Sequence, residues 1–367
     1  MSLLPFSRNF GCRVSDAFTY QGRPWILMEN EVISVSILPD KGAEFFNITY
    51  KPLDLNPLAR YSFDLAPTPY PATIPNTDGA FQDYNFGGWQ EMFPNAGGPA
   101  SVMGAELGRH GEAALLPWRW QVVTDRSDEV SVCLWVQTRR TPFRLERTVT
   151  IRANQANIIL DETITNTGKE TWPYLWGHHP AFGAPFLSSD CVLDVPAGRI
   201  ETHHQPQGTP TRLPAGAHGQ WPKMQDVHGK QIDLRFIPPP TTGTADMFYL
   251  LDLKSGWYAL TNRVLGAGFA LIWDKNVFPV LWVWQEFKGS QGSPWFSNAY
   301  VTGLEPCTGY AVQGSAGLTE AIKAGYQRHL MAGESLSTRL QAVLFHKPGI
   351  QGVREIDANS TQMSFIE

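Results

Sequence analysis

The sequence of 367 residues has few cysteines and no long apolar run. Its cysteines are scattered, without a CxxC pair, which argues against a zinc site and gives weak support for a disulfide framework. No stretch of about 18 apolar residues is present, so no transmembrane helix is expected. The first residues, Met1 to Gly11, lack a charged start followed by an apolar core and make a poor signal peptide. These absences favour a soluble cytoplasmic protein.

Clustered basic residues and nucleotide-binding motifs are also missing. The net charge is -5 and charged residues make up 17% of the chain, so neither nucleic acid nor membrane is an expected partner. The patterns GxGxxG, GxxxxGK[ST], HExxH and GxSxG do not occur, which weakens nucleotide-binding, metalloprotease and α/β-hydrolase interpretations. His203 and His204 are adjacent but have no carboxylate or cysteine at ligand spacing, so no metal is expected there.

What the chain contains in abundance is strand signal. Its 33 glycines and 28 prolines punctuate many short segments, which argues against long helices. Gly317 to Lys323 is the one short helical pattern that we find, and Leu53 to Asn85 and Arg199 to Gln231 are expected to be long loops. Alternating or continuous apolar runs predict strands in Glu129–Gln137, Phe143–Arg152, Ile158–Ile164, Ala245–Leu253, Gly268–Trp273, Phe278–Trp284 and Leu336–Phe345.

This organisation predicts an all-β protein of stacked antiparallel sheets. Periodicity alone leaves a sandwich, a barrel and a propeller open. No composition shift marks an internal boundary, so residues 1–350 are expected to form one domain. Residues 351–367 are polar and are expected to form a loose C-terminal tail.

Glu305 and His179 are the candidates for acid–base chemistry. Glu305 lies in the sequence GLEPCTG after one apolar run, and His179 lies in GHHPAF at the end of another. A carboxylate and an imidazole supply a base and an acid able to work near neutral pH. Taken singly, such a glutamate is commonly a solvated loop residue, and such a histidine is equally often held inside the fold. In an extended strand His178 points away from the side that His179 faces, so only one of them is expected at a site.

Other candidates for ligand binding are single residues in short motifs. His110 in GRHGEAALLPW and Asp246 in TADMFY are, by themselves, typical of a loop histidine and a turn aspartate. Trp89 in GGWQEMFPN is a candidate pocket residue. Trp282 and Trp284 share one strand face, and core packing is the more common role for one or both of them.

Taken in order, these segments resemble the aldose 1-epimerase (galactose mutarotase-like) superfamily, from about Val32 to Phe345. The order and spacing of the motifs carry the resemblance, since each motif alone is weak. The matching segments are Leu38–Glu44, Gly87–Pro94, His110–Gly111 with Leu116–Trp118, Gly177–Phe182, Asp246, Leu304–Pro306 and Ala332–Glu334.

The resemblance implies a large twisted antiparallel β-sandwich, the galactose mutarotase-like supersandwich, which agrees with the strand pattern. It implies Glu305 and His179, rather than His178, as the catalytic pair. The sequence has no clear counterpart of the arginine that galactose-type members use near their first motif, and Arg109 is the candidate there. Substrate contacts are then expected from His110, Asp246, Trp89, Trp284 and Arg109.

The implied reaction interconverts the α and β anomers of a hexose or related sugar. Ring opening takes a proton from the C1 hydroxyl and delivers one to the ring oxygen, with Glu305 as base and His179 as acid, and the roles reverse on closure. Burial is expected to raise the pKa of Glu305, and a carboxylate neighbour to keep His179 protonated. No metal or organic cofactor is required. Near Trp89 stand Gln90 and Glu91 rather than a basic cluster, which argues mildly against a phosphorylated sugar.

Two alternatives remain open from the sequence. One is a catalytically silent carbohydrate-binding protein on the same fold, which would tolerate loss of Glu305. The other is a β-sandwich lyase or hydrolase, in which Asp246 and Glu305 would flank a glycosidic bond as a carboxylate pair.

Overall fold

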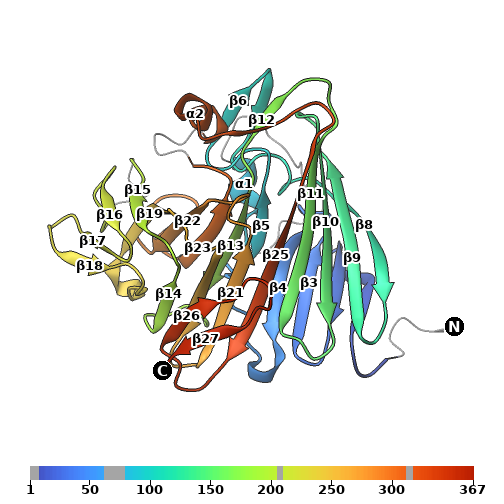
Figure 1. Cartoon of the computed structure of the whole chain (residues 1–367), viewed down its shortest axis with the longest axis horizontal. Coiled ribbons are helices and arrows are strands. Elements are labelled where there is room, and N and C mark those ends of the chain that lie inside the picture. Colours follow the sequence, from blue (N-terminus) through green and yellow to red (C-terminus); the bar gives the residue numbers. More distant parts are fainter. Residues whose placement is uncertain (1–7, 62–78, 205–209, 311–316) are drawn as a thin grey trace.

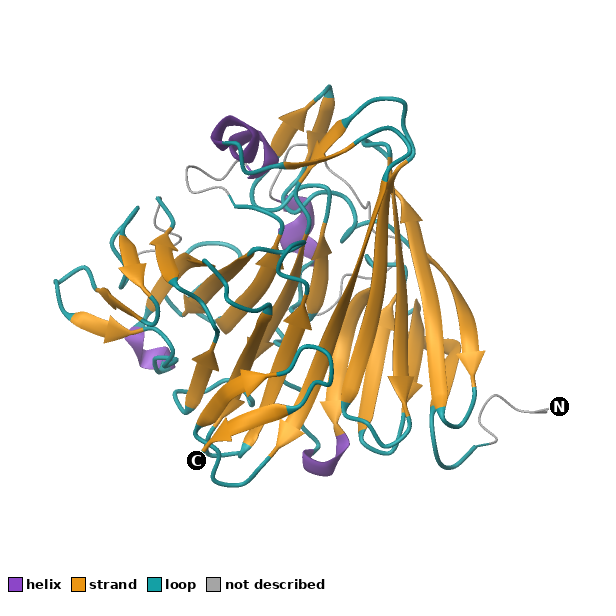
Figure 2. Ribbon diagram, in the orientation of Figure 1, coloured by secondary structure: helices purple, strands orange, loops and turns teal. Residues whose placement is uncertain are grey.

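The computed structural model describes residues 8–61, 79–204, 210–310 and 317–367. Within them the chain is almost entirely β-structure, built from two large antiparallel sheets that face each other (Figure 2). The predicted all-β class and antiparallel sandwich are therefore confirmed. No described helix is long and apolar enough to span a membrane.

The larger sheet runs through the whole molecule and carries a short-stranded arm at one end (Figure 1). Its thirteen described strands are, in spatial order, β1 (Arg13–Tyr20), β2 (Arg23–Glu29), β3 (Ile33–Leu38), β4 (Glu44–Tyr50), β5 (Trp89–Met92), β13 (Gly177–Gly183), β23 (Tyr300–Cys307), β22 (Val280–Phe287), β19 (Thr244–Leu251), β15 (Arg199–Thr202), β16 (His218–Gln220), β17 (Lys223–Gln225) and β18 (Gln231–Asp233).

The smaller sheet contains the long, regularly alternating strands. In spatial order its described strands are β14 (Cys191–Asp194), β20 (Trp257–Asn262), β21 (Ala267–Trp273), β25 (Ser335–His346), β11 (Asn157–Asn166), β10 (Phe143–Arg152), β9 (Glu129–Gln137) and β8 (Arg119–Asp125). The remaining described elements are the pairs β6 (Ala100–Val102) with β7 (Ala105–Leu107), β12 (Trp172–Tyr174) with β24 (Arg328–Leu330) and β26 (Gly352–Ile356) with β27 (Met363–Ile366), the helices α1 (Gly79–Tyr84) and α2 (Gly317–Ala324), and the 3₁₀ turns η1 (Lys51–Leu53) and η2 (Pro240–Thr242).

Period-two patterning explains why the strands form where the sequence predicts them. In β10, Leu145, Val149 and Ile151 share one face and are fully buried between the sheets. The predicted strands at 129–137 and 143–152 are found with those bounds, and the helix predicted at 317–323 is found at 317–324. Local alternation is therefore a sufficient signal where one face of a strand meets the core.

Central strands of the larger sheet separate two apolar layers. On β19, Phe248 and Leu250 point into the core between the sheets, whereas Tyr249 belongs to a second buried cluster on the opposite face. The same division holds on β22, where Leu281 faces the inter-sheet core and Trp282 the other side. The larger sheet thus has a second, occupied face, and the candidate site lies there.

Two segments differ from their predicted structure. The expected loop at 199–231 contains β15, β16 and β17. Each of these strands has only three or four residues, which is too short for an alternating pattern to be recognised. The expected loose tail at 351–367 forms the hairpin of β26 and β27, because Val353 and Ile356 pack against Trp257. Of the expected loop at 53–85, residues 62–78 lie outside the described part of the chain, and α1 follows them.

Candidate active site

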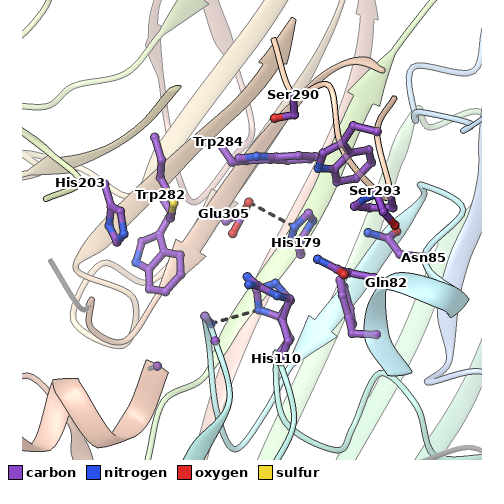
Figure 3. Close-up of a pocket in the computed structure, with 18 of the residues that line it drawn as sticks. Gln82, Asn85, His110, His179, His203, Trp282, Trp284, Ser290, Ser293 and Glu305 are labelled. Carbon is purple, nitrogen blue, oxygen red and sulfur yellow. Dashed lines mark hydrogen bonds and ion pairs between the residues drawn. The ribbon is translucent and has the colours of Figure 1, made fainter. Parts of the chain in front are cut away.

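A cavity of about 360 Å³ lies on the second face of the larger sheet (Figure 3). Strands β13, β19, β22 and β23 form its floor, and loops together with α1 form its walls. Aromatic side chains contribute much of the lining, among them Phe81, Trp282, Trp284 and Trp295. This volume lies in the range typical of small-molecule sites, and rings beside polar groups suit an amphipathic ligand.

Cross-strand register aligns four lining residues in one row. Trp282 on β22 is the partner of Glu305 on β23, and Tyr249 on β19 is the partner of Trp282. His179 on β13 stands opposite Glu305, since the residues two positions to either side of them are partners. Side chains of directly opposed residues project to the same face of a sheet. The row of His179, Glu305, Trp282 and Tyr249 is thus a direct result of strand pairing.

The structure brings together His179 and Glu305, the two residues predicted from the sequence as an acid–base pair. The His179 Nε2 atom lies 3.3 Å from Glu305 Oε1, and both side chains are almost fully buried. Burial raises the pKa of Glu305 to about 8, against the smaller, opposing effect of the Arg109 charge. Burial also lowers the pKa of His179 to about 4. The prediction that His179 stays protonated is therefore wrong, because burial disfavours the charged imidazolium and the Arg109 charge acts in the same direction.

These two pKa values mean that the pair holds one proton across a wide pH range. Below a pH of about 4 both groups are protonated, and above about 8 neither is. In between, one group can donate a proton while the other accepts one. Such an arrangement has the chemical means to act as acid and base at the same time.

His110 lies beside this pair on a turn. Its Nδ1 atom accepts a hydrogen bond of 3.1 Å from the backbone N–H of Gly97, and its ring stands 5.3 Å from that of His179. Burial, together with the charges of His179 and Arg109, lowers the pKa of His110 well below the usual value. Because a neutral imidazole that accepts at Nδ1 carries its proton at Nε2, His110 is set as a donor through Nε2.

Arg109 and Trp284, which the sequence analysis expects to contact substrate, both line the cavity. The positive charge of Arg109 lowers the pKa of Glu305 and of His179 and hence reaches both members of the pair. Trp284 lies with its ring centroid 5.2 Å from that of Trp295 and 5.9 Å from that of His179. The Trp284 ring lies beside the His179–Glu305 pair (Figure 3).

Asp246, by contrast, lies on the wrong face of its strand. Successive side chains of a strand point to opposite faces, and Met247 and Tyr249 line the cavity, so Asp246 projects to the other face of β19. Its carboxylate accepts hydrogen bonds from Thr211 and from the backbone and side chain of Arg212. The predicted sugar contact is therefore not available, because Asp246 instead holds the segment that follows residue 210.

Trp89 is likewise placed in the core and not in the cavity. Its side chain is 1% exposed, and its ring packs against Phe45 and Phe269 between the sheets. Its indole N–H donates to His178 Nδ1 at 3.3 Å. Gln90, the next residue, has the opposite parity and hydrogen-bonds Asn85, which does line the cavity. The predicted substrate contact of Trp89 is therefore wrong, because its side chain points to the core face of β5.

His178 faces away from His179, as the extended strand predicts. It reaches Glu162 Oε2 at 3.0 Å and Glu91 Oε2 at 3.5 Å, and Arg147 forms ion pairs with both of these carboxylates. Burial acts to raise the pKa of Glu162, but the charges of His178 and Arg147 lower it to about 2. We call these four residues the buried charge cluster.

Metal binding is not the role we assign to the buried charge cluster. Ligand atoms of Glu91, Glu162 and His178 lie within 4.8 Å of one another, the one such group among the described residues. The guanidinium of Arg147 already provides the cation between the two carboxylates. Removing one partner from such a buried network is strongly destabilising, so the cluster fixes β13, and with it His179, against the smaller sheet.

Sequence reasoning missed several lining residues. His203 and Tyr249 border one end of the cavity, and Phe81 from α1 packs its ring 4.6 Å from His110. Tyr249 falls within a predicted strand, but only the register with Trp282 reveals that it faces the site. Phe81 and His203 lie in segments expected to be loops, where no periodicity identifies the inward side.

Comparison with known proteins places this chain in a family without an assigned role. The model of the family described as a domain of unknown function (DUF4432) matches residues 21–343, and the protein belongs to that family. No curated protein matches the sequence.

Solved structures show the wider relationship. The chain resembles Slr1438 from Synechocystis (TM-score 0.61, 14% identity, 91% of this chain and 99% of that one). It also resembles the galactose mutarotase related enzyme from Lactobacillus acidophilus (0.58, 16%, 88% and 98%). A third is a galactose mutarotase-like protein from Clostridium acetobutylicum (0.58, 11%, 92% and 99%). At these identities the likeness establishes a galactose mutarotase-like fold.

Proposed function

We propose that this protein is an aldose 1-epimerase, which interconverts the α and β anomers of a hexose or related sugar. The observation that supports this most directly is the His179–Glu305 pair, 3.3 Å apart and buried in an aromatic-lined cavity. Anomer interconversion needs one acid and one base within reach of the same carbon, and a pair with one proton supplies both.

The reaction balances within the pair. On opening, the bond between C1 and the ring oxygen breaks while the C1 hydroxyl loses its proton to one member of the pair. The other member donates the shared proton to the ring oxygen, which leaves an open-chain aldehyde and a pair that still holds one proton. Rotation about the C1–C2 bond exposes the other face of the carbonyl, and closure with the proton roles reversed gives the opposite anomer.

The remaining lining residues suit this chemistry. His110 offers an N–H donor from Nε2 beside the pair, which can hold the ring oxygen or a neighbouring hydroxyl. Trp282 and Trp284 offer flat apolar faces of the kind on which the C–H surface of a pyranose packs. The low local dielectric of a buried site also strengthens each hydrogen bond made inside it. No metal or organic cofactor enters the proposed steps.

Two other activities are less consistent with this geometry. A glycosidase would need two carboxylates that flank one bond, and Asp246 faces the other side of the sheet from Glu305. A silent sugar-binding protein could keep the aromatic lining, but it has no use for a buried acid–base pair with one proton. The test is polarimetry of freshly dissolved α-anomers of several aldoses. Faster relaxation in the presence of the protein supports the proposal, and unchanged relaxation with every aldose contradicts it.

A further inference from the structure

The end of the cavity away from His179 contains a second pair of polar side chains. His203 Nδ1 and the Tyr249 hydroxyl are 2.8 Å apart, and both residues line the cavity. In Figure 3 His203 lies on the side of Glu305 opposite to His179. Neither residue has a part in the proton transfers described above. We call these two residues the distal pair.

Strand pairing fixes where the distal pair stands. Tyr249 belongs to the row that contains Glu305 and is separated from it by the one strand that carries Trp282. Neighbouring strands are about 4.8 Å apart, so the backbones of Tyr249 and Glu305 are separated by roughly 10 Å. His203 is held at the same place, because its backbone N–H donates to the carbonyl of Met247 on β19. A ligand whose reacting carbon meets Glu305 therefore presents its far side to the distal pair.

The hydrogen bond within the distal pair determines what His203 can offer. If the tyrosine hydroxyl donates to Nδ1, the neutral imidazole carries its proton at Nε2 and donates there. If Nδ1 donates to the tyrosine oxygen, Nε2 is an acceptor. No described residue donates to or accepts from Nε2 of His203. Only a group that both donates and accepts matches either arrangement, and a hydroxyl is such a group.

We propose that the His203–Tyr249 pair is the specificity-determining subsite of the cavity and binds a sugar hydroxyl on the side of the ring away from the anomeric carbon. This inference rests on the proposed function for its substrate class. It gives the distal pair the hydroxyl-binding role that the sequence suggested for Asp246, whose carboxylate is already used by Thr211 and Arg212.

The charge state of the distal pair is consistent with a neutral ligand group. Burial lowers the pKa of His203 to about 4, with smaller effects from His204 and Arg109. Burial, together with the charge of Glu305, raises the pKa of Tyr249 well above the usual value. Both side chains are therefore uncharged at neutral pH. A phosphate or an ammonium at this position would be desolvated without a charged partner from the pair, whereas a hydroxyl is matched.

The test pairs protein variants with deoxy sugars that each lack one hydroxyl away from C1. For wild type, kcat/KM should fall by about 5- to 140-fold for one member of the series, because its missing hydroxyl leaves a buried polar group unpaired. In Tyr249→Phe and His203→Phe the same deoxy sugar should react as well as the parent sugar. Tyr310→Phe is the matched control, since its ring packs 5.0 Å from Tyr249 but its hydroxyl donates to Glu201 outside the cavity.

The outcomes separate this inference from the proposed function. The subsite is supported if the fall in kcat/KM caused by the missing hydroxyl, the deoxy penalty, disappears in both distal variants but remains in Tyr310→Phe. An active protein whose deoxy penalties are unchanged in the distal variants contradicts the subsite and leaves the epimerase proposal standing. If no sugar reacts, the same comparison is made for binding by calorimetry. Absence of both reaction and binding contradicts the proposed function and the subsite together.

Discussion

His178 and His179 are neighbours in the chain, yet they lie on opposite faces of β13 and belong to different networks. His178 reaches Glu162 in the buried charge cluster, and His179 reaches Glu305 in the cavity. One strand therefore links the packing of the two sheets to the placement of the acid–base pair. The two histidines should respond to substitution in different ways.

Replacing His179 should affect activity far more than stability. His179→Asn removes one member of the pair, and we expect kcat to fall by about 10²- to 10⁴-fold with little change in the free energy of unfolding. His178→Phe should instead lower the free energy of unfolding by about 1–3 kcal/mol, because Glu162 and Glu91 lose a buried partner. Mutarotation rates and urea denaturation of both variants test this. Equal stability losses for the two would contradict the division of roles.

Arg147 should be the most sensitive member of the buried charge cluster. Arg147→Met leaves two buried carboxylates without their shared cation, so we expect a loss of about 3–5 kcal/mol in the free energy of unfolding. Arg339→Met on β25 is the control, since Arg339 forms a surface ion pair with Asp161 and should cost at most about 1 kcal/mol. Denaturant unfolding of both variants measures the difference, and similar small losses would mean that the cluster does not hold the sheets together.

Glu162 should make the protein sensitive to acid in a defined range. Its pKa is about 2 in the folded protein and about 4.3 in an unfolded chain, so its stabilising effect is present above the unfolded value. That effect is lost as the pH falls through the window from about 4.3 to about 2. The free energy of unfolding of wild type should drop in this window more steeply than that of Glu162→Gln. Parallel curves for the two proteins would rule out this contribution.

The activity should follow a bell-shaped pH profile. Below a pH of about 4 the His179–Glu305 pair takes up a second proton and has no acceptor, and above about 8 it loses its last proton and has no donor. Because burial holds the pKa of His110 well below its usual value, we expect it to add no limb near 6.5. Values of kcat/KM, corrected for spontaneous mutarotation, should show both limbs. A single limb near 6.5, typical of an exposed histidine, would contradict the one-proton pair.

Sequence patterns determined most of the fold but only part of the site. Alternation located β9, β10, β11 and β25 of the smaller sheet, because every second residue of these strands meets the core, whereas β8, β14 and β20 were not predicted. The family resemblance located His179 and Glu305, which strand pairing then brings together. Asp246 was misplaced because Arg212, 34 residues earlier in the chain, binds its carboxylate. Loops that are distant in the sequence determine which face of β19 lines a cavity. Local periodicity therefore cannot predict it.

The most direct test of the account is the mutarotation rate of wild type and Glu305→Gln, followed by polarimetry on the aldose that wild type accelerates most. Glu146→Gln, the same change at a half-exposed position of β10, is the control. Sugar binding is followed by the change in intrinsic tryptophan fluorescence, to which the cavity residues Trp282, Trp284 and Trp295 contribute. We expect Glu305→Gln to bind sugar but lose at least about 10²-fold in rate, with Glu146→Gln unchanged. Wild-type rates in Glu305→Gln would contradict the central claim that the His179–Glu305 pair carries out the reaction.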